Sequence, residues 1–166
     1  MSPDIHRTEL RTRIIDAWDE VGRPTQRLVE HECEECQQLE AAFASLEWKV
    51  VPVELLRENF DAQPLFSPEA FHGFLPAYLV YSLERFGEDE VSEFTLYTLS
   101  PGSDIKINPT WWQRRFSHFQ LIQLSLVYDF LNLALVDQNI TLDKTAIRRG
   151  MDRLKQFVEP CLQNNR

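Results

Sequence analysis

The sequence predicts a single, mainly α-helical domain, and three observations support this prediction. Apolar residues recur at spacings of three and four along most of the chain, which is the pattern of amphipathic helices. Only five glycines occur, so few strained turns are available. A chain of 166 residues with 43% hydrophobic content can bury one core without disulfides. We therefore expect a single globular domain over residues 1–166, a compact bundle of about six to seven helices with one long loop around residues 100–112.

The N-terminal part of the chain carries the signals of two amphipathic helices. Residues 4–21 place apolar side chains at helical spacing before a glycine and a proline end the segment. A second helix is expected over residues 33–46, where Cys36, Leu39 and Phe43 form one stripe. Cys36 is therefore expected to begin the buried face of this helix.

Two helices are expected in the middle of the chain. A short one covers residues 53–59, and a longer one starts at Ser67-Pro68-Glu69, which supplies an N-cap, a first-turn proline and a first-turn acid. Pro76 cannot donate a hydrogen bond to the carbonyl of His72, so we expect a kink there or two helices that meet near Leu75. Four aromatic residues of this segment share one helical face and favour core packing: Phe71, Phe74, Tyr78 and Tyr81.

Three helices are expected in the remainder of the chain. The apolar residues of 90–99 fit neither a helical nor a strand period cleanly, but Val91, Phe94 and Tyr97 would share one helical face, so we expect a helix. Residues 119–136, with Ser117 as the cap, are apolar nearly all round, which predicts a central helix surrounded by others. The last helix is expected to start at Thr141 and to end at Pro160.

Charge and composition argue against two classes of partner. The formal net charge of −9 disfavours nucleic-acid binding, because phosphate contacts need clustered lysine and arginine. The apolar run 119–136 is interrupted by polar residues and by Asp129, and a charge is expensive inside a membrane. No basic stretch followed by an apolar run begins the chain, so the expected location is the cytoplasm. An acidic surface instead favours a basic protein partner.

The segment His31-Glu32-Cys33-Glu34-Glu35-Cys36 is the one local cluster with metal-site chemistry. Two thiolates and an imidazole suit zinc, which prefers tetrahedral sulfur and nitrogen ligands. The three side chains can converge when His31 lies in a loop and Cys33 and Cys36 lie on the first helical turn. Cys161 is the preferred fourth ligand, because it follows the expected last helix and would tie the two ends of the fold together.

Other interpretations of this cluster stay open. A three-ligand site with bound water would be of the catalytic type, with Glu32 or Glu35 as the general base. In a second interpretation, Cys33 and Cys36 are ordinary thiols at a helix start, beside a solvent-exposed His31. A redox pair of the thioredoxin kind is a third, although the flanking acids raise thiol pKa values and no strand, helix, strand pattern surrounds the pair.

The segment Trp111-Trp112-Gln113-Arg114-Arg115 combines two large aromatic side chains with two guanidinium groups. This composition is enriched at interface hot spots. We therefore predict that Trp111, Trp112, Arg114 and Arg115 bind a partner. In the alternative interpretation the tryptophans cap the core and the arginines pair with the many acidic residues.

Three motifs follow one another in the first half of the chain. They are His31-x-Cys33-x-x-Cys36, then Ser67-Pro68-Glu69-Ala70-Phe71, then Leu75-Pro76-Ala77-Tyr78-Leu79. This order resembles a bacterial family catalogued as a domain of unknown function, and the resemblance spans about residues 14–131. The resemblance implies an intracellular bacterial protein of one small domain, and it implies no activity.

The sequence as a whole favours a non-enzymatic interaction module. Small size, acidity and abundant aromatic residues, without a nucleophile or phosphate-loop motif, suit a protein that neutralises a basic partner, as immunity and antitoxin proteins do. Two alternatives stay open. One is a metal-dependent enzyme of the hydrolase type that uses His31, Cys33 and Cys36. The other is a structural domain that zinc stabilises.

Overall fold

The computed structural model describes residues 3–100 and 109–163, with side chains described over residues 5–100 and 110–157. The mainly helical prediction is confirmed, because the described residues form eight α-helices and no strand. The helices are α1 (Pro3–Ala17), α2 (Glu34–Phe43), α3 (Val53–Glu58), α4 (Pro68–Glu84), α5 (Glu90–Leu99), α6 (Pro109–Arg115), α7 (Leu121–Val136) and α8 (Lys144–Gln163). Two short 3-10 helices, η1 (Trp48–Val50) and η2 (Gln63–Leu65), lie on either side of α3.

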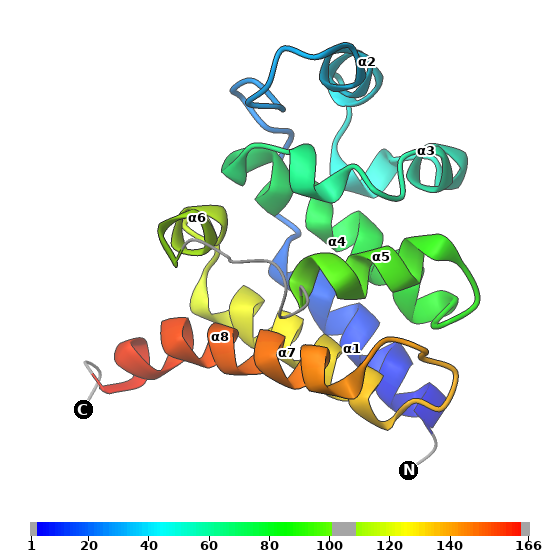
Figure 1. The fold of residues 1–166 in the computed structure, drawn as a ribbon, viewed down its shortest axis with the longest axis vertical. Helices are drawn as coiled ribbons and strands as arrows, with labels where there is room; N and C mark the ends of the chain where they lie inside the picture. Colours follow the sequence, from blue (N-terminus) through cyan, green and yellow to red (C-terminus); the bar gives the residue numbers. More distant parts are fainter. Residues whose placement is uncertain (1–2, 101–108, 164–166) are drawn as a thin grey trace.

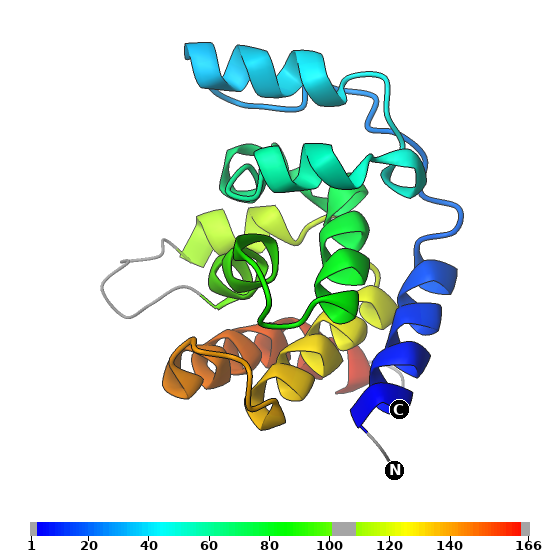
Figure 2. The same cartoon turned by 90° about the vertical axis from the view of Figure 1, so that its right-hand side faces the viewer.

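Helix α4 runs through the middle of the molecule (Figure 1). It packs against α1 and α5, and α7 packs against both α8 and α1. Helices α2 and α3 lie at the opposite end from α7 and α8 (Figure 1), and Figure 2 shows α2 as a separate layer above α3 and the start of α4. Helix α2 is therefore peripheral and exposes one long side.

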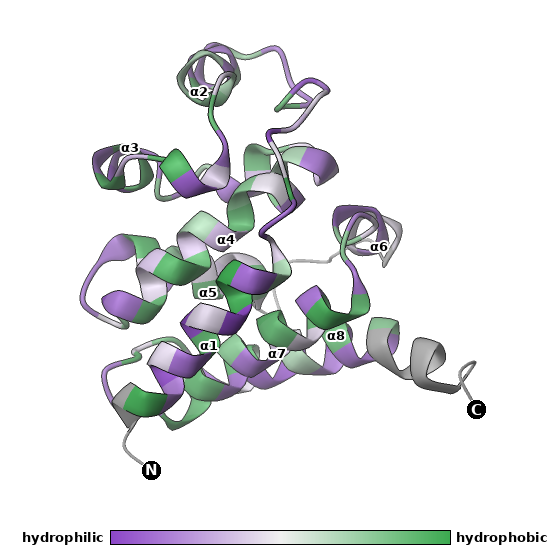
Figure 3. Cartoon of the chain, turned by 180° about the vertical axis from the view of Figure 1, so that it is seen from behind, coloured by the Kyte–Doolittle hydropathy of each residue, from purple (hydrophilic) through white to green (hydrophobic). Residues whose placement is uncertain are grey.

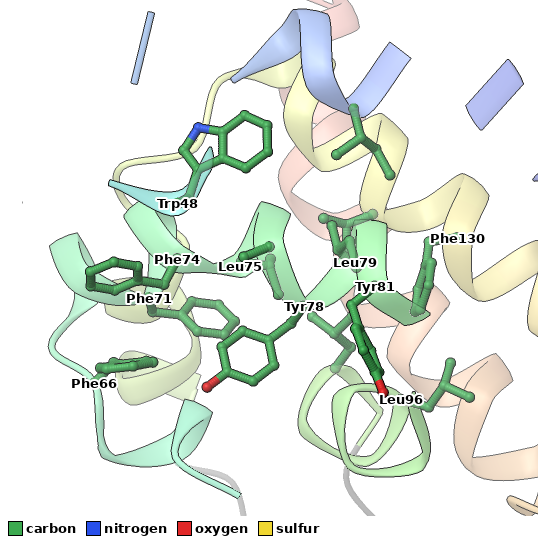
Figure 4. Packing of buried hydrophobic residues seen from close by; sticks show 14 of the residues in the cluster. Trp48, Phe66, Phe71, Phe74, Leu75, Tyr78, Leu79, Tyr81, Leu96 and Phe130 are labelled. Carbon is green, nitrogen blue, oxygen red and sulfur yellow. The ribbon is translucent and has the colours of Figure 1, made fainter. Parts of the chain in front are cut away.

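Aromatic side chains of α4 fill the centre of the core. Phe71, Phe74, Tyr78 and Tyr81 are all buried, as the aromatic stripe predicts (Figure 4). Phe43 of α2 makes an edge contact with Phe74, with ring centroids 5.1 Å apart. Burial of a phenylalanine stabilises a fold by about 1.5–3 kcal/mol, so this contact contributes strongly to the attachment of α2.

Pro76 lies inside α4, which continues through it as one helix. Proline has no N–H group, so the carbonyl of His72, four residues earlier, has no helical partner. The indole Nε1 of Trp18 donates a hydrogen bond to this carbonyl over 3.1 Å. The residue that follows α1 thus supplies the missing donor, and α4 need not split into two helices.

The expected loop around residues 100–112 is shorter than predicted. Residues 109–115 form α6, and residues 101–108 lie outside the described part of the chain. The next helix begins after Gln120 and not at Ser117, because the side chain of Gln123 accepts a hydrogen bond from the Gln120 N–H over 2.9 Å. The hydroxyl of Ser117 instead donates to the carbonyl of Arg114 and closes α6.

Both ends of the last helix also differ from the prediction. The carboxylate of Asp143 accepts a hydrogen bond from the N–H of Thr145 over 2.9 Å, which places the start of α8 at Lys144. The hydroxyl of Thr141 donates to Glu93 of α5. At its other end α8 continues through Pro160. None of the helices in the described residues combines the length and apolar character that a membrane span requires.

The side-chain amide of Gln123 connects three helices. Its Nε2 donates to the carbonyl of Ala17 at the end of α1 over 3.0 Å, and its Oε1 lies 2.9 Å from Nε2 of His72 in α4. Because Oε1 is an acceptor, Nε2 of His72 carries the proton. Burial lowers the pKa of His72 below its usual value of 6.5, because the charged ring would lose its hydration, and the hydrogen bond to Gln123 opposes this shift only in part.

This buried histidine predicts a pH-dependent stability. The lowered pKa means that the folded protein prefers the neutral ring of His72. The stability that this preference contributes is complete above pH 6.5 and is lost as the pH falls below that value. The variant His72→Gln keeps a hydrogen-bond donor but cannot titrate. We expect its free energy of unfolding to fall less than that of the wild type between about pH 7 and pH 5, measured by urea unfolding.

The exposed His31 provides a control for the substitution itself, because His31→Gln makes the same replacement outside the core. Equal slopes for the wild type and His72→Gln would contradict the assignment of this dependence to His72.

Candidate functional site

The chain between α1 and α2 is held in place by the start of α4. The carboxylate of Glu69 accepts hydrogen bonds from the backbone N–H groups of Thr25 and Gln26, over 2.9 and 3.2 Å. The hydroxyl of Ser67, which is the N-cap of α4, donates to the carbonyl of Arg27 over 2.9 Å. This mostly hydrophilic segment (Figure 3) therefore enters α2 along a defined path.

Cys33 is the N-cap residue of α2. Its backbone is extended, and its Sγ accepts a hydrogen bond from the N–H of Cys36 over 3.4 Å. Cys33 is exposed, whereas Cys36 is fully buried beside Leu39 and Phe43, as the apolar stripe predicts. The two thiols therefore share one helical turn but differ completely in their access to solvent.

The pKa values of the two thiols move in opposite directions. Hydrogen bonds from the Cys36 thiol and from the Cys36 backbone N–H lower the pKa of Cys33, and the charge of Glu35 opposes this shift. Burial raises the pKa of Cys36 to about 11, and its hydrogen bond to Cys33 adds to the increase. Cys33 is thus the thiol that ionises first, despite the surrounding carboxylates.

The predicted metal ligands do not converge in the described structure. His31 is exposed, and no group of three His, Cys, Asp or Glu side chains within the described residues is placed to hold an ion. Cys161 belongs to α8, and its side chain lies outside the described residues. Zinc at this cluster therefore stays a prediction, which elemental analysis of protein purified without added metal can test.

The predicted partner-binding residues divide into two pairs. Trp111 is 41% exposed and the side chain of Arg114 is 62% exposed. Trp112 and Arg115, by contrast, are both buried. This division follows from the α-helical conformation of residues 109–115, since neighbouring residues on a helix point in different directions.

Arg115 anchors α6 to the centre of the molecule. Its guanidinium donates hydrogen bonds to the carbonyls of Gln63 and Phe66, and it lies 3.8 Å from the ring centroid of Phe71. Burial lowers the pKa of Arg115, because the charge has little water around it, and the carboxylate of Glu30 opposes this shift. The role of Arg115 is thus to hold η2, α4 and α6 together.

The two sequence motifs meet in space. Glu30, just before the cysteine cluster, forms an ion pair with Arg114 of α6. These two residues line a small hollow of about 50 Å³ together with His31 and Trp111. We call these four residues the α2–α6 corner. Sequence reasoning singled out both motifs but missed their proximity, because 84 positions separate Glu30 from Arg114.

A larger hollow of about 450 Å³ lies between α1 and α7. Its lining is mostly polar and includes His6, Glu9 and Asn132. An ion pair between Arg13 and Asp129 crosses it, with 3.2 Å between the nitrogen and the oxygen. This ion pair connects the two helices, and we assign the hollow no further role.

Comparison of the chain with protein-family models, with curated proteins and with solved structures finds no match.

Proposed function

We propose that this protein is a non-enzymatic interaction module that binds a basic protein through the start of α2 and the α2–α6 corner. The observation that carries the proposal is the ion pair of Glu30 with Arg114, which places the acidic segment before α2 at the hollow that the exposed Trp111 also lines. A surface of this kind combines electrostatic steering with an aromatic anchor.

Charge at the start of α2 supports a basic partner. Between residues 28 and 47 the chain has six glutamates and no lysine or arginine. The side chain of Glu32 is 83% exposed, and Glu34 and Glu35 are also exposed. Within the described residues, neither Glu34 nor Glu35 takes part in an ion pair. The carboxylates of Glu34 and Glu35 are therefore available to steer and pair with cationic side chains, whereas Glu32 already pairs with Arg27.

The aromatic residue of the corner fits the same partner chemistry. A lysine or arginine of the partner can lie over the open part of the Trp111 ring while it pairs with a carboxylate of the acidic segment. The buried Arg115 contacts the same ring, since its guanidinium carbon lies 5.1 Å from the Trp111 ring centroid. Trp111 thus packs against a buried residue while 41% of its surface stays exposed.

A pair of charge variants tests this proposal. The double variant Glu34→Gln, Glu35→Gln should weaken binding of the basic partner by about three- to tenfold, mainly through a slower association rate. Trp111→Ala should weaken it by about tenfold or more. Capture from a lysate of the source organism at about 0.15 M salt, followed by binding kinetics with the identified partner, measures both effects.

The matched control is Glu88→Gln, Glu90→Gln, which removes the same charge from two exposed residues before and at the start of α5. This control should change the affinity by less than about twofold. If both double variants weaken the affinity for the partner equally, binding depends on the net charge of the protein. That result would contradict a specific role for the start of α2. Retention of no basic protein at all would contradict the proposed function.

A further inference from the structure

We propose that Cys33 and Cys36 form a redox-active dithiol that reacts with low-molecular-weight disulfides. The proposal is independent of the interaction function described above. It rests on the hydrogen bond from the Cys36 backbone N–H to Sγ of Cys33 and on the difference in exposure between the two thiols.

The positions of the two residues suit disulfide formation. Cys33 caps α2 and Cys36 is the third residue of its first turn, so both side chains lie on one side of the helix. The Sγ of Cys33 already lies 3.4 Å from the backbone nitrogen of Cys36. A disulfide requires Cα atoms about 4.4–6.8 Å apart, a separation that residues three apart within one helical turn can meet.

Exposure sets the order of the two steps. Cys33 is the only one of the pair that an external disulfide can reach. Its thiolate attacks one sulfur of the reagent, forms a mixed disulfide and releases the first small thiolate. Cys36 then attacks the Cys33 sulfur, forms the Cys33–Cys36 disulfide and releases the second. The two protons of the protein thiols pass to the two departing thiolates, so the protein loses two electrons and the reagent gains them.

The surrounding charge selects among such reagents. Glu32, Glu34 and Glu35 are exposed beside Cys33. Their negative field repels an anionic disulfide and attracts a cationic one. Both effects weaken as salt screens the three carboxylates. The substrate class is therefore cationic or neutral small disulfides.

The experiment uses the full-length chain with Cys161→Ser, so that only the two cysteines of α2 react. Cystamine, which is cationic, should convert the protein to a species that has lost two hydrogen atoms by mass spectrometry. Glutathione disulfide, which is anionic, should react about tenfold more slowly at low salt, and this ratio should shrink in Glu34→Gln, Glu35→Gln.

Single variants establish the order of attack. Cys36→Ala should stop at the mixed disulfide on Cys33, and Cys33→Ser should react at least about tenfold more slowly than the intact pair. Because Cys36 is fully buried, its variant can be unstable. Alkylation of the chain that retains both cysteines gives the order without that variant, since iodoacetamide should modify Cys33 well before Cys36.

A protein that keeps the mixed disulfide on Cys33 without closing the ring would overturn the proposal. So would equal reactivity of Cys36 in Cys33→Ser, or failure of both reagents to oxidise the pair.

Discussion

Replacement of Arg115 with alanine should lower the free energy of unfolding by about 3 kcal/mol. The guanidinium donates to two buried carbonyls, those of Gln63 and Phe66, and the variant would leave both without their charged donor. It would also remove the cation–π contact with Phe71 and leave a cavity at the base of α6. Relief of the buried charge offsets only part of this loss. Urea unfolding measures the difference.

The adjacent Arg114 gives a matched control for this prediction. Arg114→Ala removes the same side chain from the same helix, but this side chain is exposed and its partner Glu30 is also accessible. We expect a loss of less than about 1 kcal/mol. If the two variants destabilise the protein equally, Arg115 does not anchor α6 in the manner described.

Replacement of Gly150 with alanine should destabilise the protein by about 2 kcal/mol. Gly150 lies in α8 where this helix crosses the end of α5, and an added Cβ would approach Cβ of Ser100 to 2.7 Å and the carbonyl oxygen of Leu99 to 2.8 Å. Both are too close, so α8 would have to move away from α5. The higher helix propensity of alanine returns only about 1 kcal/mol.

Gly22→Ala is the control for this second prediction, because no heavy atom lies within 4 Å of an added Cβ at that position. Its backbone is not in the left-handed region, so alanine should stabilise the fold by about 0.5 kcal/mol through the unfolded state. Thermal or urea unfolding of both variants tests the pair, and a neutral Gly150→Ala would contradict the close approach of the two helices.

Local signals allowed much of the fold to be predicted from the sequence. The start of α4 at Ser67-Pro68-Glu69 depends on four consecutive residues, because the Ser67 hydroxyl accepts a hydrogen bond from the N–H of Ala70. The aromatic residues of the same helix recur at helical spacing, and the side chains that this spacing places on one face are buried. Both signals lie within a single helix, so the sequence alone is enough to recognise them.

The parts that escaped prediction depend on distant contacts. Composition treats Arg114 and Arg115 alike, but Gln63 and Phe66 draw one of them into the core. Ser117 has the residue type of a cap, and yet a reciprocal contact with Gln123 makes Gln120 the cap. Residue spacing predicted that Cys36 lies on the buried face, but it left several roles open for the cysteine cluster, because spacing does not show whether His31 and the two thiols converge.

The hydrogen bonds of the Gln123 amide should couple the unfolding of three helices. This amide bonds to the end of α1, to the start of its own helix and to His72 in α4, while Trp18 bonds to the same His72 residue. Fraying of any one of these helices exposes polar groups that the other two had satisfied. We expect the three segments to open as one cooperative unit in amide hydrogen exchange, whereas the peripheral α2 can open separately and at lower cost.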